Sequence, residues 1–287
     1  MTPGIHTLTA EQYHADPAPT ASLSSSIANI LLDQSPLHAW LAHPRLNPNY
    51  EREDGNSRFD LGSAAHMMLL ERREDKIVRV QADDWRTKAA KEARDAAQAN
   101  GQYAVLERQF VDIVAMCAAA QDYMLTTELG DLLATGDPER TLLWQEGNLW
   151  YRARPDMLSK DRRIILDYKS TASAAPDAIA KQIGRMGYDL QAEFYTRGLA
   201  AVTGREDTVF VFLFQEITRP YACSLIALSN AYREVGRAKV NRAIGLWERC
   251  VTGDNWPGYT PRILWVEPKP WDLIQAEEQP NAEELTT

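Results

Sequence analysis

The sequence predicts an α/β domain in which helices flank a mixed central β-sheet. Hydrophobic residues alternate with period two from about residue 140, which is typical of strands, and helical patterns stand before, between and after the strands. The chain has 287 residues and is 45% hydrophobic, so it can bury a sizeable core. It contains no repeated unit, which excludes solenoids and other repeat architectures.

Helical patterns dominate the first 135 residues. A serine among residues 22–25 can cap a first helix, and Pro36 can begin a second one. Residues 47–58 are polar and predict a loop. The sequence then predicts, in order, a helix at 59–74, a short strand at 76–81 and a mostly helical stretch at 83–124.

Strand patterns dominate residues 141–171 and 208–229, with a helical pattern between them and another after them. The Gly147-Asn148 turn joins the first two strands as an antiparallel hairpin. The predicted elements are strands at 141–146, 149–158 and 164–171, a helical section at 176–202, strands at 208–217 and 221–229, and an amphipathic helix from Asn230 to about Cys250.

These patterns predict one main domain between two terminal segments. We expect an N-terminal arm at 1–20, a single domain at 21–265 and an acidic C-terminal tail at 266–287. The domain divides into a helical part at 21–135 and a core at 140–265. Five acidic residues and no basic ones lie between Asp272 and the C-terminus, so they account for five of the nine excess negative charges. The rest of the chain has nearly equal numbers of acidic and basic residues.

Charge and composition limit the classes of function. A net charge of −9 argues against a broadly basic nucleic-acid surface, although a local basic groove with bound cations remains compatible with it. The three cysteines, Cys117, Cys223 and Cys250, are too few for a four-thiolate metal site and predict no disulfide framework. The longest apolar runs have about ten residues, half of what a membrane helix needs, and the N-terminus lacks a leader pattern. We therefore expect a cytoplasmic protein without membrane contact.

The residues most suited to chemistry lie on the strands at 149–158 and 164–171. Alternation places Asp167 and Lys169 on one face of their strand, and Pro155 ends the preceding strand so that Asp156 can turn towards them. Two carboxylates and a main-chain carbonyl suit Mg²⁺, while a lysine can orient a water for phosphodiester hydrolysis. The alternative interpretation of Asp167 and Lys169 is an ion pair on an edge strand.

Three sequence runs and the opening of the helical part resemble the PD-(D/E)xK nuclease signature, and they follow one another along the chain as they do in that family. The run RARPDML…IILDYKST carries Asp156, Asp167 and Lys169, the run GSAAHMMLLE carries Gly62 and His66, and QAEFY carries Gln191 and Tyr195. Together with the opening of the helical part, they cover residues 20 to 250 and are similar to the RecB-like branch, in particular to phage and prophage RecE-type exonucleases of the exodeoxyribonuclease VIII kind.

The resemblance implies a restriction-endonuclease-like core and a Mg²⁺-dependent exodeoxyribonuclease that degrades duplex DNA from an end, 5′ to 3′, in phage recombination, with Mn²⁺ as a substitute ion. It implies that Asp156, Asp167 and the main-chain carbonyl of Tyr168 hold the metal and that His66 completes a second site. Lys169 would position the water, and Gln191 and Tyr195 would steady the scissile region. The implied partners are double-stranded DNA ends, a single-strand annealing recombinase and further copies of the chain, in the cytoplasm of a bacterial host.

The residues suggest further contacts near this site. Glu146 ends the strand before Asp156 and is a secondary candidate ligand, although it is equally suited to a turn. Glu71 lies five residues after His66, about 140° round an α-helix, which argues against a shared metal. Candidate DNA contacts are Arg152, Arg154, Ser170, Thr171, Arg86 and Lys88.

Three other interpretations remain open. The first is an endonuclease of the same fold. The second is a DNA-binding or scaffolding protein without turnover, although a binding module has no reason to place two carboxylates beside a phosphate unless a cation intervenes. The third is an unrelated α/β protein in which the motifs coincide by chance.

Overall fold

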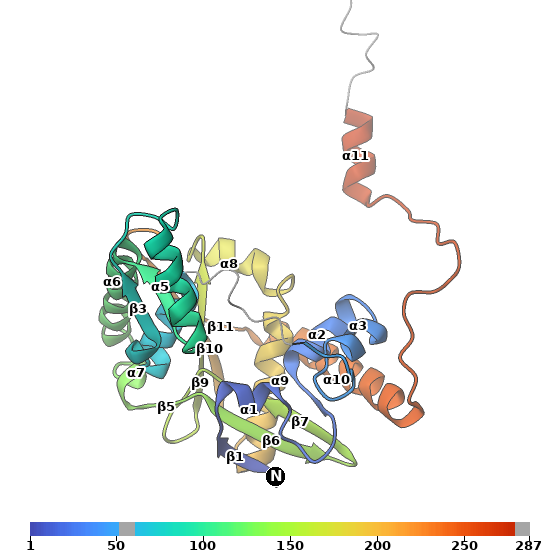
Figure 1. Cartoon of the computed structure of the whole chain (residues 1–287). Coiled ribbons are helices and arrows are strands. Elements are labelled where there is room, and N and C mark those ends of the chain that lie inside the picture. Colours follow the sequence, from blue (N-terminus) through green and yellow to red (C-terminus); the bar gives the residue numbers. More distant parts are fainter. Residues whose placement is uncertain (52–60, 279–287) are drawn as a thin grey trace, which may run out of the picture. The chain divides into compact units, whose positions relative to one another are not determined.

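The strands form two main sheets and one small one (Figure 1). The computed structural model describes residues 1–51 and 61–278; residues 1–257 form one compact unit and those from Gly258 onward a second. The predicted loop at 47–58 and the predicted acidic tail lie partly outside the described residues, as does the start of the predicted helix at 59–74.

The five-stranded sheet carries the residues of greatest chemical interest. Its strand order is β11-β10-β9-β8-β5. Strand β9 pairs in parallel with β10 and antiparallel with β8, so the sheet is mixed, and the predicted fold class is confirmed. The strands are β5 (Asp137–Pro138), β8 (Met157–Leu158), β9 (Ile164–Thr171), β10 (Val209–Glu216) and β11 (Cys223–Ala227).

The remaining strands form two other sheets. A four-stranded sheet has the order β1-β6-β7-β2, and a parallel pair β3-β4 stands apart. Their bounds are β1 (Gly4–Thr7), β2 (Ser22–Leu23), β3 (Ile77–Val80), β4 (Tyr103–Leu106), β6 (Arg140–Glu146) and β7 (Leu149–Ala153).

The expectation of one continuous strand at 149–158 is corrected, because its two halves belong to different sheets. The predicted strand at 149–158 breaks into β7 and β8, because Pro155 lacks the N–H that a continuous ladder would need. The chain thus passes from the four-stranded to the five-stranded sheet at residues 154–156, and Asp156 lies at this crossing.

Helices cover these sheets. Ser24 caps α2, with its hydroxyl accepting from the N–H of Ile27, and Pro36 begins α3, as predicted. The helices are α1 (Ala10–His14), α2 (Ser25–Asp33), α3 (Pro36–Leu41), α4 (Leu61–His66), α5 (Lys88–Ala99), α6 (Glu107–Leu125), α7 (Leu132–Thr135), α8 (Pro176–Ile183), α9 (Tyr188–Thr203), α10 (Asn230–Gly253) and α11 (Pro270–Glu278), with a π-helical turn at Met67–Glu71 and a 3₁₀ turn at Glu74–Lys76. No helix of the described ranges is long and apolar enough to span a bilayer.

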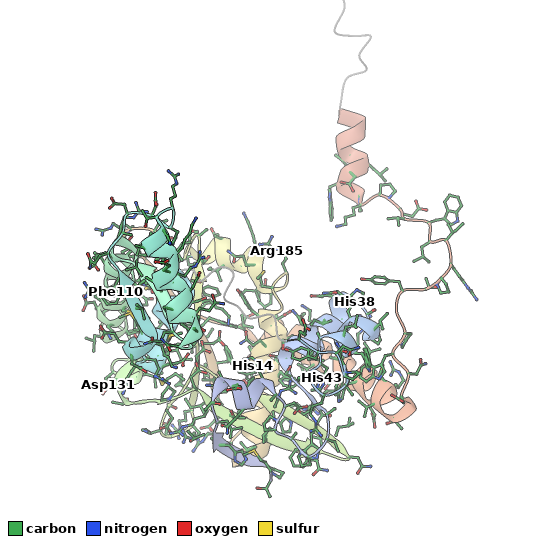
Figure 2. All side chains as sticks on the ribbon, viewed as in Figure 1. His14, His38, His43, Phe110, Asp131 and Arg185 are labelled. Carbon is green, nitrogen blue, oxygen red and sulfur yellow. The ribbon has the colours of Figure 1, made fainter. Side chains whose placement is uncertain are left out.

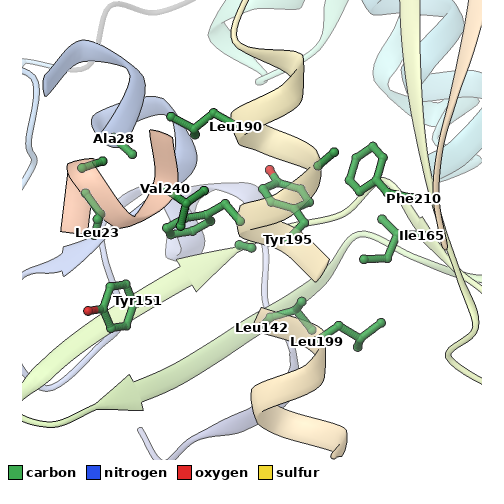
Figure 3. Packing of buried hydrophobic residues seen from close by; sticks show 14 of the residues in the cluster. Leu23, Ala28, Leu142, Tyr151, Ile165, Leu190, Tyr195, Leu199, Phe210 and Val240 are labelled. Carbon is green, nitrogen blue, oxygen red and sulfur yellow. The ribbon is translucent and has the colours of Figure 1, made fainter. Parts of the chain in front are cut away.

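Two hydrophobic clusters pack on opposite faces of β9 and β10. Ile165 and the phenylalanines of β10 join one cluster, which includes Tyr195 and Leu199 of α9 and Val240 of α10 (Figure 3). Leu166 and Leu213 join the other cluster, which includes residues of α4 and α6. Because both faces are covered, a charged side chain on β9 is removed from water unless it points to an opening.

The first residues of the chain are not a separate arm. Strand β1 pairs antiparallel with β6, where Gly4 lies opposite Leu143. Asp16 is buried, and its carboxylate accepts hydrogen bonds from the main chain and the hydroxyl of Ser22 at 2.8 and 2.6 Å. His43, which follows α3 (Figure 2), is fully buried beside the same group, with Nε2 3.1 Å from the Ser22 carbonyl. The predicted boundary at residue 20 is therefore wrong, and the first unit ends at Pro257, not at 265.

The second unit has a short helix, α11, and an extended segment before it. This segment is apolar but unusually exposed: Ile263, Trp265 and Val266 have 87%, 89% and 90% of their surface accessible.

Asp137 anchors β5 to the loop after β8. Its carboxylate lies against Lys160, 2.7 Å from Arg162 and 3.6 Å from Arg140. Hydrogen bonds from Lys160 and Arg162 lower the pKa of Asp137 to about 2 despite the opposing effect of burial. The loop and the edge strand are thus held together by charge.

Replacing Asp137 with asparagine should lower the free energy of unfolding by roughly 1–3 kcal/mol at pH 7. Because the pKa is lower in the folded than in the unfolded chain, the carboxylate stabilises the fold at neutral pH, and this contribution disappears as the pH falls from about 4 to about 2. Urea unfolding at pH 7 and pH 2 measures it, with the exposed Asp122→Asn as control. Equal losses for both variants would contradict the prediction.

Candidate metal and catalytic site

The ladder between β8 and β9 places the two predicted aspartates together. Met157 lies opposite Leu166, so the same register continued by one residue sets Asp156 opposite Asp167. The link is direct, because the main-chain N–H of Tyr168 donates to Asp156 Oδ2 at 2.7 Å. The two acids therefore share one short stretch of backbone.

Asp167 contacts two side chains that the sequence also singled out. It forms an ion pair with the Lys169 ammonium from the same face of β9, and it accepts a hydrogen bond from Gln191 Nε2 of α9 at 2.7 Å. The Asp167 side chain is only 2% exposed, whereas that of Lys169 is 22% exposed. The lysine thus stands between the buried acid and the solvent.

A second group of ligand-type atoms surrounds Asp156. His66, at the end of α4, places Nε2 3.3 Å from Asp156 Oδ2 and 3.6 Å from Glu139 Oε1. One ligand atom from each of these three residues lies within 4.8 Å of the others. Glu139 was not predicted, and it replaces Glu146 as the third carboxylate of the site.

The helix around His66 is not a regular α-helix. Met67–Glu71 form a π-helical turn, in which the N–H of Arg72 donates to the carbonyl of Met67 five residues earlier. In this geometry residues five apart lie about one turn apart, so the Glu71 side chain lies beside that of His66, with Oε1 3.9 Å from Nδ1. Glu71 thus lies beside the other ring nitrogen of His66 and is not among the three residues whose ligand atoms converge, so the expectation that it shares no metal with His66 stays a prediction.

The charges in this group alter one another's pKa. Burial raises the pKa of Asp167 to about 6, with a further increase from Asp156, and burial with the Asp156 charge raises that of Glu139 to about 7. Burial alone would lower the pKa of His66, but the carboxylates of Asp156, Glu139 and Glu71 outweigh it and raise the value to about 9. The site is therefore rich in negative charge that only nearby cations can compensate.

The residues fit a divalent cation. Glu139 Oε1 is buried and accepts no hydrogen bond from the residues that the structure describes, so a ligand atom is available beside His66 and Asp156. A mixed set of one imidazole and several carboxylates suits Mn²⁺ as well as Mg²⁺. The main-chain carbonyl of Tyr168 remains a predicted ligand.

A cavity of about 470 Å³ opens onto these groups. His66, Lys169 and Ser170 line it, so both groups of charged residues reach the same space. The remaining lining residues are Gly62, Ser63, Met67, Glu71, Tyr168 and Tyr188.

Glu146 lies elsewhere. It forms an ion pair with Arg197 of α9 and accepts a hydrogen bond from Trp144 Nε1 at 3.0 Å. It stands at the turn end of the β6–β7 hairpin, opposite Leu149. The hairpin instead brings the start of β6 towards Asp156, and the main-chain N–H of Glu139 donates to the Asp156 carbonyl at 3.0 Å.

The predicted arginine face for DNA is also corrected. Arg152 is 4% exposed and donates to the carbonyl and hydroxyl of Ser22, at 2.6 and 2.8 Å. Its hydrogen bonds are therefore made inside the protein and not at a surface that DNA could reach. Arg154 donates from Nε to Glu139 Oε2 at 2.5 Å. It therefore orients a candidate metal ligand, although its buried Nη1 finds no acceptor within the described parts of the chain.

The other predicted contacts divide by exposure. Ser170 is exposed on the cavity wall, whereas Thr171 is buried and its hydroxyl donates to the Ser173 carbonyl at 3.1 Å. Arg86 and Lys88 have 91% and 90% of their side chains exposed and face Asp84 and Glu92 in solvent. Only Ser170 of these residues lines the cavity.

Tyr195 lies behind the site. It is 7% exposed and packs its ring against Phe210, with centroids 5.9 Å apart (Figure 3). Burial raises the pKa of its phenol well above the usual value, and the charges of Asp167 and Asp156 add to this. The structure therefore brings Gln191, but not Tyr195, into hydrogen-bond contact with Asp167.

Comparison with protein families gives one match. The model of a family described as "PDDEXK-like domain of unknown function (DUF3799)" matches residues 32–264. The match includes every one of the candidate ligands named above. A search of curated proteins gave no match.

The comparison with solved structures includes two exonucleases. A provisionally named exonuclease from Eubacterium rectale has a TM-score of 0.60 at 14% identity, over 93% of this chain and 98% of that one. A phage-related exonuclease from Haemophilus somnus 129PT has a TM-score of 0.31 at 12% identity, over 67% of this chain and 95% of that one. At these identities, the first similarity concerns the fold alone.

Replacing Glu139 with glutamine should weaken Mn²⁺ binding by about tenfold or more, because it removes a charged oxygen beside His66 and Asp156. Isothermal titration with Mn²⁺ on the folded protein measures the change. Glu146→Gln is the matched control, since Glu146 pairs with Arg197 outside this group, and its affinity should equal that of the wild type. Equal weakening by both substitutions would remove Glu139 from the site.

Proposed function

Because the chain belongs to the family of PDDEXK-like domains of unknown function, we propose that it is a metal-dependent deoxyribonuclease. One observation carries this proposal. Ligand atoms of His66, Glu139 and Asp156 lie within 4.8 Å of one another, and Lys169, which pairs with Asp167, lines the same cavity as His66. An acidic site with one ammonium at its edge suits an anionic substrate only when cations offset the carboxylates.

Each residue has a distinct task in phosphodiester hydrolysis. His66, Glu139 and Asp156 would hold the cation, and Asp167 would face it from the adjacent strand. A bound divalent cation supplies a Lewis acid and makes water more acidic. Lys169 would orient that water and offset charge on the phosphate, while Gln191 fixes the Asp167 carboxylate by its hydrogen bond of 2.7 Å.

The finer proposal is an exonuclease of the RecE type. It would use Mg²⁺ to degrade one strand of duplex DNA from an end, in the 5′ to 3′ direction, during phage recombination. The four motifs in their order along residues 20 to 250 support it. Association with a single-strand annealing protein and with further copies of the chain, in a bacterial cytoplasm, belongs to the same proposal.

The test compares a linear duplex with a covalently closed circular one in the presence of Mg²⁺. The wild type should degrade only the linear DNA, and labels at the 5′ and 3′ ends should report the polarity. Cleavage of the circle would identify an endonuclease, and DNA binding without cleavage would identify a scaffolding protein.

Asp167→Asn and Lys169→Ala should each lower the cleavage rate by at least about a hundredfold, because both groups adjoin the proposed reaction centre. The exposed Asp122→Asn and Lys181→Ala are matched controls and should retain full activity. Wild-type rates in either site variant would contradict the assigned roles.

A further inference from the structure

We propose that Tyr188, which no motif of the signature contains, is a positioning residue whose ring holds the Lys169 ammonium in place for hydrolysis. This inference rests on the proposed function. Lys169 Nζ lies 5.5 Å from the centroid of the Tyr188 ring, within the range of a cation–π interaction. Both residues line the 470 Å³ cavity.

Lys169 needs such a constraint. A lysine side chain has four rotatable bonds and a compact charge, so one ion pair fixes its distance from Asp167 but not its direction. The Tyr188 ring supplies a second restraint from another element, because Tyr188 begins α9 while Asp167 and Lys169 lie on β9. Two restraints from different elements define a direction into the cavity.

The Tyr188 ring is itself held firmly. Its centroid lies 5.4 Å from that of Phe212 and 5.7 Å from that of Phe214, both on β10. The preceding residue, Gly187, has φ of +68°, and a Cβ there would lie 2.4 Å from the Asn29 side chain of α2. The positive φ and this close approach both favour glycine at the residue that precedes Tyr188 and α9.

Helix α9 thus organises both members of the acid–lysine pair. Tyr188 and Gln191 are three residues apart and share a helix face. Gln191 donates to Asp167, while the Tyr188 ring meets Lys169. A single rigid helix would then fix the acid by an amide and the ammonium by an aromatic ring.

Two other roles for Tyr188 give different outcomes. If the ring only fills the core, its loss should reduce stability and leave the chemical step unchanged. If it stacks on a nucleotide base at the cavity wall, its loss should weaken DNA binding and leave the rate at saturation unchanged.

The kinetic test uses three variants in the Mg²⁺-loaded protein. Tyr188→Leu should lower the single-turnover cleavage rate at saturating DNA by about tenfold, which corresponds to about 1.4 kcal/mol. Tyr188→Phe keeps the ring and should remain within about twofold of the wild type. Tyr232→Leu, on α10, is the control and should have no effect. DNA affinity measured with Ca²⁺ should be the same in all four proteins.

A second readout does not depend on activity. Nuclear magnetic resonance of ¹³C-labelled lysines, with Lys169 assigned through Lys169→Arg, should show a ring-current shift at its ε-carbon in the wild type and Tyr188→Phe, and none in Tyr188→Leu. Absence of that shift in the wild type, an unchanged rate in Tyr188→Leu, or an effect on DNA affinity alone would overturn the inference. A wild type that cleaves no DNA but still shows the ring-current shift would instead refute the proposed function. The shift therefore distinguishes failure of the proposed function from failure of the Tyr188–Lys169 contact.

Discussion

The constraint on which the site depends is the placement of two carboxylates side by side: Asp167, which is buried on β9, and Asp156, which lies just before β8 with its side chain 15% exposed. Each raises the cost of ionising the other, and burial adds to that cost. The surrounding structure compensates with one imidazolium, one ammonium and a main-chain N–H, from His66, Lys169 and Tyr168. The two neighbouring acids, the lysine at the cavity edge and the Glu139 oxygen that accepts no hydrogen bond from the described residues belong to this arrangement.

The chain passes from one main sheet to the other next to Asp156, and this break between β7 and β8 allows the Asp156 side chain to turn into the site. Pro155 ends the pairing of β7, and the chain then enters β8 in the other sheet, so Asp156 lies at the seam. Arg154 and Glu139 pair beside it, which joins the start of β6 to the crossing. A continuous strand would leave no irregular backbone to turn Asp156 towards His66.

The parts of the site that obey strand periodicity were predictable from the sequence. Alternation placed Asp167 with Lys169. The role of Gln191 came instead from the resemblance to the nuclease signature, which gave it together with Tyr195, and only Gln191 meets Asp167. Glu139 could have been predicted too, because counting back from the Gly147-Asn148 turn sets it opposite Asp156, whereas Glu146 belongs to the turn. The interior role of Arg152 could not, since it depends on Asp16 and Ser22, which are distant in sequence.

The π-helical turn after His66 has a consequence for how this segment can change. It contains one residue more than an α-helix of equal length would need, so deleting any residue between Met67 and Glu71 would return the winding to the common form. Downstream side chains would rotate by about 100°, which would move Leu69 and Leu70 out of the core or Glu71 away from the imidazole. Chain length at this point therefore determines whether Glu71 can lie beside His66 while Leu69 and Leu70 stay in the core.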